Sequence, residues 1–311
     1  MAASKPLPRS TGFTFGGRLA RREALECYLF ILPWFLGFML LKLGPILASL
    51  YLSFTEYNVI APAHWVGLSN YLTLAHDPLF WTSLRVTALY VFMFLPLRLL
   101  FSLLLALLLN QKVRGIVFFR TVFYVPSIIS GVAVSLLWLW IFNPDYGILN
   151  VLLSYVGVVG PGWLFDETWA LPSIVLMSLW GIGDTMLIYL AGLQGIPTDL
   201  YEAVEMDGAG WWAKFWSITL PMLSPVIFFN LVMGIISSFQ VFTPAYVMTK
   251  GGPDNATLFY NFYLYNNAFV YIKMGLGSAM AWILLLIVLV FTLLVFKSSP
   301  LWVHYQASRG K

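Results

Sequence analysis

Charged residues are scarce in this sequence. Only 10% of its 311 residues are Asp, Glu, Lys or Arg, whereas 60% are hydrophobic, and the mean hydropathy is +0.84. A soluble globular domain carries about 25% charged residues, because water must solvate its surface. This chain lacks the charge needed to cover a sphere of its size, so much of its surface must face lipid. The composition therefore excludes a large soluble domain.

Cysteine, histidine and phosphate-binding loops are also rare or absent. The single Cys27 excludes an internal disulfide and a cysteine-rich metal site. His64, His76 and His304 lie in predicted loops and in the tail without metal-ligand spacing, which argues against a membrane-embedded metalloenzyme. The sequence has no G-x-x-x-x-G-K-[ST] phosphate loop, so we do not expect this chain to hydrolyse ATP.

Long apolar runs dominate what is present, and about 20 apolar residues suffice to cross hydrocarbon. Six windows qualify: Leu29–Leu52, Val86–Leu109, Thr121–Phe142, Leu171–Leu193, Met222–Met248 and Ser278–Phe296. Lipid offers no partner for backbone N–H and C=O groups, so we expect helices throughout, with kinks or first turns at Pro33, Pro96 and Pro126. The first window is too long for a signal peptide. The sequence thus predicts an all-α membrane protein with six transmembrane helices.

The basic residues predict the orientation of these helices. Twelve Lys or Arg fall in the odd-numbered flanking segments, 1–28, 110–120, 194–221 and 297–311. Three fall in the even-numbered ones, 53–85, 143–170 and 249–277. The positive-inside rule places the first set, and with it both termini, in the cytoplasm. Because the basic residues flank apolar runs instead of forming one patch, the net charge of +4 does not indicate nucleic-acid binding.

The predicted organisation follows from these windows. An N-terminal cytoplasmic segment, 1–28, precedes a six-helix transmembrane domain, 29–297, and a cytoplasmic tail, 298–311. Within the first segment, the charged run Gly16–Cys27 is expected to form a helix at the membrane surface.

One predicted cytoplasmic segment, residues 194–221, differs from the others and reads QGIPTDLYEAVEMDGAGWWAKFWSITLP. Thr198 is expected to cap a short helix, with Asp199 in the first turn, where the helix dipole favours negative charge. Asp207-Gly208 then interrupts the helix, and the aromatic stretch Trp211–Ile218 leads to the next span. Such a helix fits docking into a partner's groove, although a connector resting on the membrane has the same pattern.

The same segment resembles the EAA loop of ABC importer permeases. The matching residues are Glu202-Ala203-Val204, with Val204 in place of the second Ala, Asp207-Gly208-Ala209, and Ile218, Leu220 and Pro221. Further stretches extend the resemblance over nearly all of the chain: Leu43-Gly44-Pro45, Trp65–Tyr71, Tyr124-Val125-Pro126, Asn143-Pro144 with Gly147–Asn150, and Thr249–Pro253. Together they are similar to the carbohydrate-uptake branch, the binding-protein-dependent inner membrane components related to the maltose and glycerol-phosphate permeases.

This resemblance implies the type I ABC importer permease fold and a set of partners in a prokaryotic inner membrane. They are a second permease subunit, two ATPase subunits that bind ATP and Mg, and an extracytoplasmic binding protein that delivers a sugar or oligosaccharide. No cofactor is expected in this chain itself. The resemblance assigns ATPase coupling to Glu202, Ala203, Val204, Asp207 and Gly208. On that analogy Glu202 makes polar contacts, Ala203 allows close approach and Gly208 permits the bend.

Polar residues inside the predicted spans are candidate solute contacts. Asp184, in the fourth span, could accept hydrogen bonds from two sugar hydroxyls, or it could pair with a buried base such as Lys42 or Arg98. Resemblance to the maltose permease implies a substrate path at Trp180, Gly181, Asp184, Ser237, Ser238 and Gln240. The serines could instead form helix–helix hydrogen bonds.

Other interpretations stay open. If Lys42 and Arg98 both line the path, a phosphorylated or acidic sugar is favoured; we favour a charge-neutral sugar bound through Asp184. A permease for glycerol phosphoesters or another polar solute is an alternative within the same class. An ion-coupled secondary transporter would show inverted repeats, and the sequence has no convincing internal repeat. That class also leaves the EAA-type loop unexplained.

Overall fold

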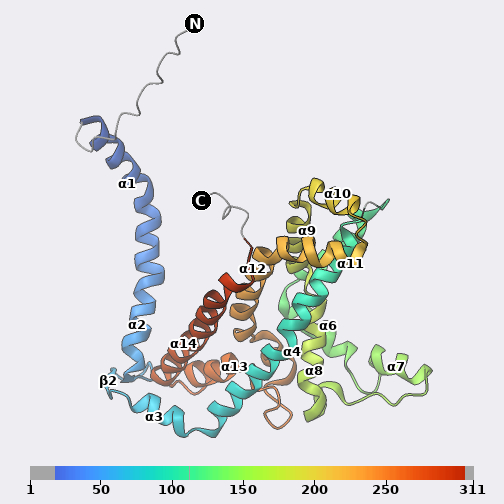
Figure 1. The fold of residues 1–311 in the computed structure, drawn as a ribbon. Coiled ribbons are helices and arrows are strands. Elements are labelled where there is room, and N and C mark those ends of the chain that lie inside the picture. The colour runs from blue at the N-terminus through green and yellow to red at the C-terminus, as the bar shows by residue number, and fades with distance from the viewer. Residues whose placement is uncertain (1–17, 112, 305–311) are drawn as a thin grey trace.

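The computed structural model describes residues 18–304 apart from residue 112, and helices dominate this part of the chain (Figure 1). Four helical stretches are long and apolar enough to cross a membrane: Arg21–Ser53, Pro78–Leu109, Trp211–Phe239 and Met274–Leu301. Two bent helix pairs raise the number to six if each pair is one span. The all-α fold with six spans, predicted from the sequence, is confirmed in this form.

The first span stands apart from the other helices (Figure 1). Helix α1 (Arg18–Phe38) continues through a π-helical turn, η1 (Met39–Leu43), into α2 (Gly44–Ser53), and none of the most apolar part of this span is buried. The expected separate surface helix at Gly16–Cys27 is instead part of α1 from Arg18 onward, because Arg18–Leu29 contains no Gly or Pro to end a helix. Gly16 and Gly17 lie outside the described residues.

A short irregular segment joins the first span to the second. Strands β1 (Thr55–Glu56) and β2 (His64–Trp65) form an antiparallel pair, and α3 (Ser69–His76) follows. Helix α4 (Pro78–Leu109) then begins eight residues before the predicted start of this span, Val86. The early start has a local cause: the Asp77 carboxylate accepts a hydrogen bond from Leu79 N at 2.9 Å, and Pro78 occupies the first helical position.

The third and fourth spans are both broken. Helices α5 (Ile116–Ile128) and α6 (Gly131–Ile141) meet at 98°, and α8 (Glu167–Trp180) and α9 (Gly183–Gln194) meet at 47°. For the third span, Thr121–Phe142, the sequence predicted at most a kink or a first turn at Pro126, and the prediction of one unbroken helix is therefore wrong. The break lies at Ile129-Ser130, whose backbone is extended, and not at Pro126, because a Ser-Gly pair at 130–131 ends the helix more readily. Helix α7 (Ile148–Tyr155) and the 3₁₀ turn η2 (Trp163–Phe165) connect the two bent pairs.

The fifth span lies nearer the N-terminus than predicted. After α10 (Thr198–Met206), one continuous helix runs through α11 (Trp211–Lys214), the π turn η3 (Phe215–Thr219) and α12 (Leu220–Phe239). The predicted window, Met222–Met248, is wrong at both ends. The helix ends where Gln240 leaves the helical backbone, with φ −98° and ψ 13°, and Thr243-Pro244 then begin the next helical turn. The apolar residues beyond Phe239 belong to a turn and to η4 (Ala245–Thr249).

The last elements are α13 (Tyr260–Tyr265), η5 (Asn266–Val270), α14 (Met274–Ser298) and η6 (Ser299–Leu301), and the sixth predicted window lies within α14. Two buried clusters hold the bundle together around α4. The larger one joins α4, α8, α13 and α14, and the smaller one, with Ala106, Met186 and Leu223 fully buried, lies beneath α10. In Figure 1, α10 and α11 lie at one end of the molecule and α3, α7 and α13 at the other.

Candidate functional site

The connection between α10 and α11 has a defined bend. Gly208 has φ +79°, its N–H donates to Glu205 O at 2.9 Å, and the N–H of Ala209 donates to Val204 O at 3.1 Å. These two hydrogen bonds close the end of α10 as a Schellman motif, which needs a left-handed residue at the position of Gly208. The turn predicted at Asp207-Gly208 is therefore present, with Asp207 as the last, C-capping residue of the helix.

The start of α10 differs from the prediction. Thr198 is the first helical residue, and the N-cap is Pro197, with no side-chain hydrogen bond at the cap. The expected capping role of Thr198 is therefore wrong. Pro197 takes the cap position because its ψ of 133° gives the non-helical backbone that an N-cap requires.

Helix α10 has an outer and an inner face. Asp199, Glu202, Ala203 and Met206 are exposed and form what we call the outer face of α10. The inner face carries Tyr201 and Val204, which are half-buried against the smaller hydrophobic cluster. The residue that departs from the E-A-A pattern, Val204, thus packs inward, where its larger apolar side chain fills space.

Two polar contacts brace α10 against the helix that follows. Glu205 accepts a hydrogen bond from Lys214 of α11 and forms an ion pair with it. The hydroxyls of Tyr201 and Thr219 are 3.0 Å apart, and this hydrogen bond joins α10 to η3. Since η3 continues without a break into α12, both contacts join α10 to the helix of the fifth span.

A second polar site lies within the bundle and centres on Arg98 of α4. Its Nε donates to Thr185 Oγ1 at 2.9 Å, one terminal nitrogen to Ser237 Oγ at 3.0 Å, and the other to Asp184 Oδ2 at 3.2 Å. The guanidinium also lies 5.9 Å from the centre of the Phe94 ring. Three helices, α4, α9 and α12, therefore meet at one cation.

Asp184 is the exposed member of this Arg98 cluster. Its side chain is 55% exposed, against 16% for Arg98. It sits at the start of α9, just after the break at Gly181-Ile182, and its Oδ1 accepts from Thr185 N at 2.7 Å. The break is held by close packing, because a Cβ on Gly183 would lie 2.5 Å from Phe123 O. The carboxylate is thus fixed by Arg98 on one side and accessible on the other.

The remaining predicted path residues do not all join the Arg98 cluster. Gly181 borders a separate cavity of about 200 Å³ between the bend of α5–α6 and Pro244, and the Trp180 ring stands edge-on to Trp138. Ser238 is buried, and its hydroxyl has no hydrogen-bond partner within residues 18–111 and 113–304. Gln240 lines a largely apolar cavity of about 610 Å³ between α12, α13 and α14.

Of the predicted set, only Asp184 and Ser237 come together. Lys42, the other base considered for Asp184, is exposed on η1 of the first span, whose contact with the bundle is mainly that of α2 with α14. Of the two bases considered as partners of Asp184, the structure therefore pairs it with Arg98 and not with Lys42.

The sequence interpretation missed two polar contacts beside this cluster. Thr185, which is not among the candidate residues predicted from the sequence, accepts a hydrogen bond from Arg98. Tyr90, about two turns before Arg98 on α4, donates to Ser178 Oγ at 2.9 Å. Both contacts join residues more than 80 positions apart, and no spacing along the sequence reports such pairs.

Comparisons with known proteins agree on the class of molecule. The family model described as "binding-protein-dependent transport system inner membrane component" matches residues 98–300. The probable ABC transporter permease protein YesP of Bacillus subtilis is 46% identical over 295 residues, covering 93% of this chain and 95% of the relative. The trehalose/maltose transport system permease protein MalF of Thermococcus litoralis is 34% identical over 287 residues, covering 90% and 95%.

Solved structures support the fold. A bacterial ABC transporter involved in the import of the acidic polysaccharide alginate contains a chain that matches with a TM-score of 0.79 at 23% identity, covering 91% of this chain and 99% of the other. The same kind of transporter in complex with a periplasmic protein bound to an alginate pentasaccharide matches with a TM-score of 0.76 at 23% identity. At this level of identity, the match carries the fold.

Proposed function

The chain belongs to the family of binding-protein-dependent transport system inner membrane components, and from this premise we propose that it is a permease subunit of an ATP-driven sugar importer. The resemblance read from Glu202–Pro221 is confirmed by that membership, and so is the type I ABC importer permease fold. Together with a second permease, this subunit forms the path for a sugar or oligosaccharide delivered by an extracytoplasmic binding protein. Relatives named as trehalose/maltose and lactose permeases support a carbohydrate substrate.

The outer face of α10 is the observation that carries the coupling part of this proposal. It exposes a short helix whose bend is fixed at Gly208 and whose inner face is braced on the fifth span. Helix-in-groove docking uses this kind of preformed helix. ATP and Mg bind to the ATPase subunits that receive α10, and Glu202, Ala203 and Asp207 face those subunits.

The Arg98 cluster supports a neutral sugar as the solute. Arg98 and Asp184 neutralise each other, so the site offers no net charge to attract an anion. The half-exposed Asp184 carboxylate can accept sugar hydroxyls, while Ser237 can both donate and accept. A glycerol phosphoester would need an unpaired basic side chain here to bind its phosphate, whereas Arg98 forms an ion pair with Asp184.

We infer that both termini and α10 lie in the cytoplasm of a prokaryotic cell, with this chain crossing the inner membrane several times. The excess of Lys and Arg in the odd-numbered segments supports this orientation. The start of α1 and α10 lie toward the same end of the molecule in Figure 1, as one common cytoplasmic side requires.

The test is reconstitution of the whole complex in lipid nanodiscs with its second permease, its ATPase subunits and its binding protein. ATP hydrolysis is measured while the binding protein is loaded with members of a carbohydrate panel or with glycerol phosphoesters. Stimulation by at least one neutral carbohydrate is expected. Stimulation by phosphoesters alone would overturn the substrate class, and hydrolysis that no loaded binding protein changes would overturn the importer role.

A further inference from the structure

The helix that follows α10 carries a group of exposed aromatic side chains. Trp211, Trp212 and Trp216 are 62%, 66% and 61% exposed. Trp211 stacks on Phe215 at 5.7 Å between ring centres, and Trp216 meets Phe215 edge-on at 5.4 Å. We call these four side chains the aromatic face. Exposed apolar groups of this size, gathered in one place, mark a contact surface.

The other sides of this helix have different surroundings. Lys214 pairs with Glu205 of α10, and Ile218 is buried in the smaller hydrophobic cluster. Ala213 and Ser217 are exposed, small and four residues apart, so they form a separate stripe along the helix. The helix thus has one side bound to the protein, one small polar side and one aromatic side. This pattern is typical of a helix that lies in a membrane interface.

The depth of this helix follows from contacts at the end of α14. The apolar run of α14 ends at Phe296, and the basic residue Lys297 follows. The Phe296 ring meets Phe228 of α12 edge-on at 4.9 Å, and His304 N donates to Ser224 Oγ at 2.8 Å. The start of α12 is therefore level with the end of the last span. The aromatic face directly precedes the start of α12, so it lies where hydrocarbon gives way to lipid headgroups.

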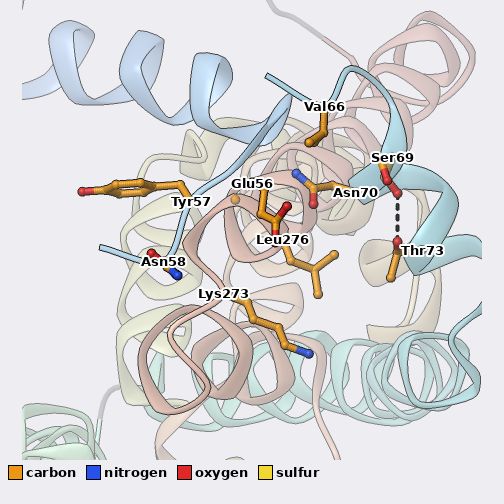
Figure 2. Close-up of a pocket in the computed structure, with 10 residues that line it drawn as sticks. Glu56, Tyr57, Asn58, Val66, Ser69, Asn70, Thr73, Lys273 and Leu276 are labelled. Atoms are coloured by element: carbon orange, nitrogen blue, oxygen red, sulfur yellow. Dashed lines mark hydrogen bonds between the residues drawn. The ribbon is translucent and has the colours of Figure 1, made fainter. Parts of the chain in front are cut away.

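The opposite end of the molecule carries a different kind of surface. A cavity of about 300 Å³ there is lined by two exposed charged side chains, Glu56 and Lys273, and by amide and hydroxyl groups (Figure 2). The aromatic face has no charged member, and its three indole N–H groups donate to no residue that the structure describes. Such rings suit the headgroup boundary, where hydrocarbon covers the ring and lipid ester carbonyls accept from the N–H.

We propose that the aromatic face inserts into the headgroup boundary of the cytoplasmic leaflet, and that the bilayer thereby holds α10 in position. Lys214 and Thr219, on the same continuous helix as the aromatic face, contact Glu205 and Tyr201 of α10. In Figure 1, α10 lies farther from the body of the bundle than α11 does, so docking on the outer face of α10 leaves α11 at the membrane. The lipid contact is independent of the importer role, whereas its effect on coupling rests on the proposed function.

The lipid contact is tested in the complete complex, assembled with cysteine-free partner subunits in nanodiscs of phosphatidylethanolamine and phosphatidylglycerol. In a Cys27→Ser background, a bimane probe is attached to Trp212→Cys, to Trp216→Cys or, as the matched control on the same helix, to Ser217→Cys. Probes at positions 212 and 216 should lose fluorescence when the nanodiscs include a phosphatidylcholine brominated near the top of its acyl chains, and aqueous iodide should quench them poorly. The probe at position 217 should respond in the opposite way, because Ser217 lies on the small polar stripe.

The effect on coupling is tested by ATP hydrolysis stimulated by loaded binding protein. Trp212→Ser combined with Trp216→Ser should reduce stimulated hydrolysis about twofold to thirtyfold, the range for residues that influence coupling between two sites without touching either ligand. Trp212→Tyr combined with Trp216→Tyr is the matched control and should retain stimulated hydrolysis, because tyrosine also favours the membrane interface.

The possible results separate the two parts of the proposal. Shielding from iodide that requires the ATPase subunits, without quenching by brominated lipid, would identify the ATPase as the occupant and overturn the lipid contact. Equal quenching by iodide at all three positions would show a hydrated surface and would overturn it too. Wild-type stimulation in the serine double variant would overturn the effect on α10. If no loaded binding protein stimulates the wild-type complex, the proposed function fails, and the quenching results still decide the lipid contact.

Discussion

Replacement of Gly208 isolates the bend of α10 from all other interactions. Its φ of +79° costs an L-residue about 1–2 kcal/mol, whereas an added Cβ would meet no atom within 4 Å. Within this chain, backbone strain is therefore the main effect, and it lowers the equilibrium constant for the native bend by about 5- to 30-fold. Gly210 offers a matched control in the same loop, because its φ is −73° and its Cβ position is equally open.

The assay is ATP hydrolysis stimulated by loaded binding protein, alongside sugar uptake into proteoliposomes. Both activities should fall in the order Gly208, Gly208→Asn, Gly208→Ala, Gly208→Val, since Asn tolerates left-handed backbone and a β-branched residue does not. Gly210→Ala should behave as wild type, and every variant should assemble normally. Equal coupled activity in Gly208→Val and Gly210→Ala would refute the role of the bend.

Three further predictions test other parts of the molecule. Glu202→Lys, on the outer face of α10, should abolish stimulated hydrolysis without reducing membrane insertion, as judged by pull-down of the ATPase subunits and by membrane fractionation. Arg98→Met should reduce sugar uptake more than Arg98→Lys does. Asp184→Asn should raise the solute concentration needed for half-maximal uptake. Each change removes part of the hydrogen-bonded Arg98 cluster. Gly275→Ala should lower the free energy of unfolding by about 1–3 kcal/mol, because the added Cβ overpacks against a backbone carbonyl. Gly37→Ala is the control and should leave this free energy unchanged, because its Cβ would meet no atom within 4 Å. Unfolding monitored in detergent measures both variants.

The sequence predicted the spans well where apolar length alone decides them. All six windows overlap helices, and the sixth lies entirely inside α14. The errors came where apolar residues do not continue a helix, as beyond Phe239 and at Ile129-Ser130. Hydropathy measures how favourably a segment partitions into lipid. The position of a helix end depends instead on backbone dihedrals, which residues such as proline, serine and glycine influence. The turn at Gly208 was predictable for the same reason, since only the dihedral mattered there.

The Arg98 cluster shows the opposite limit. The sequence named Asp184, Ser237 and Arg98 as candidates, but it could not choose among the partners of Asp184. That choice depends on how α4, α9 and α12 pack, and it is settled by contacts between residues 86 to 139 positions apart. The roles of Thr185 and Ser178 were missed because each hydroxyl has an ordinary local alternative, a hydrogen bond within its own helix.

The most direct measurement of the central claim is solute uptake into proteoliposomes that contain the complete complex, with the loaded binding protein outside. Uptake should require ATP hydrolysis by the partner subunits, should persist when ionophores abolish every ion gradient, and should be lost in Glu202→Lys. Uptake that proceeds without ATP and collapses with an ion gradient would contradict the account.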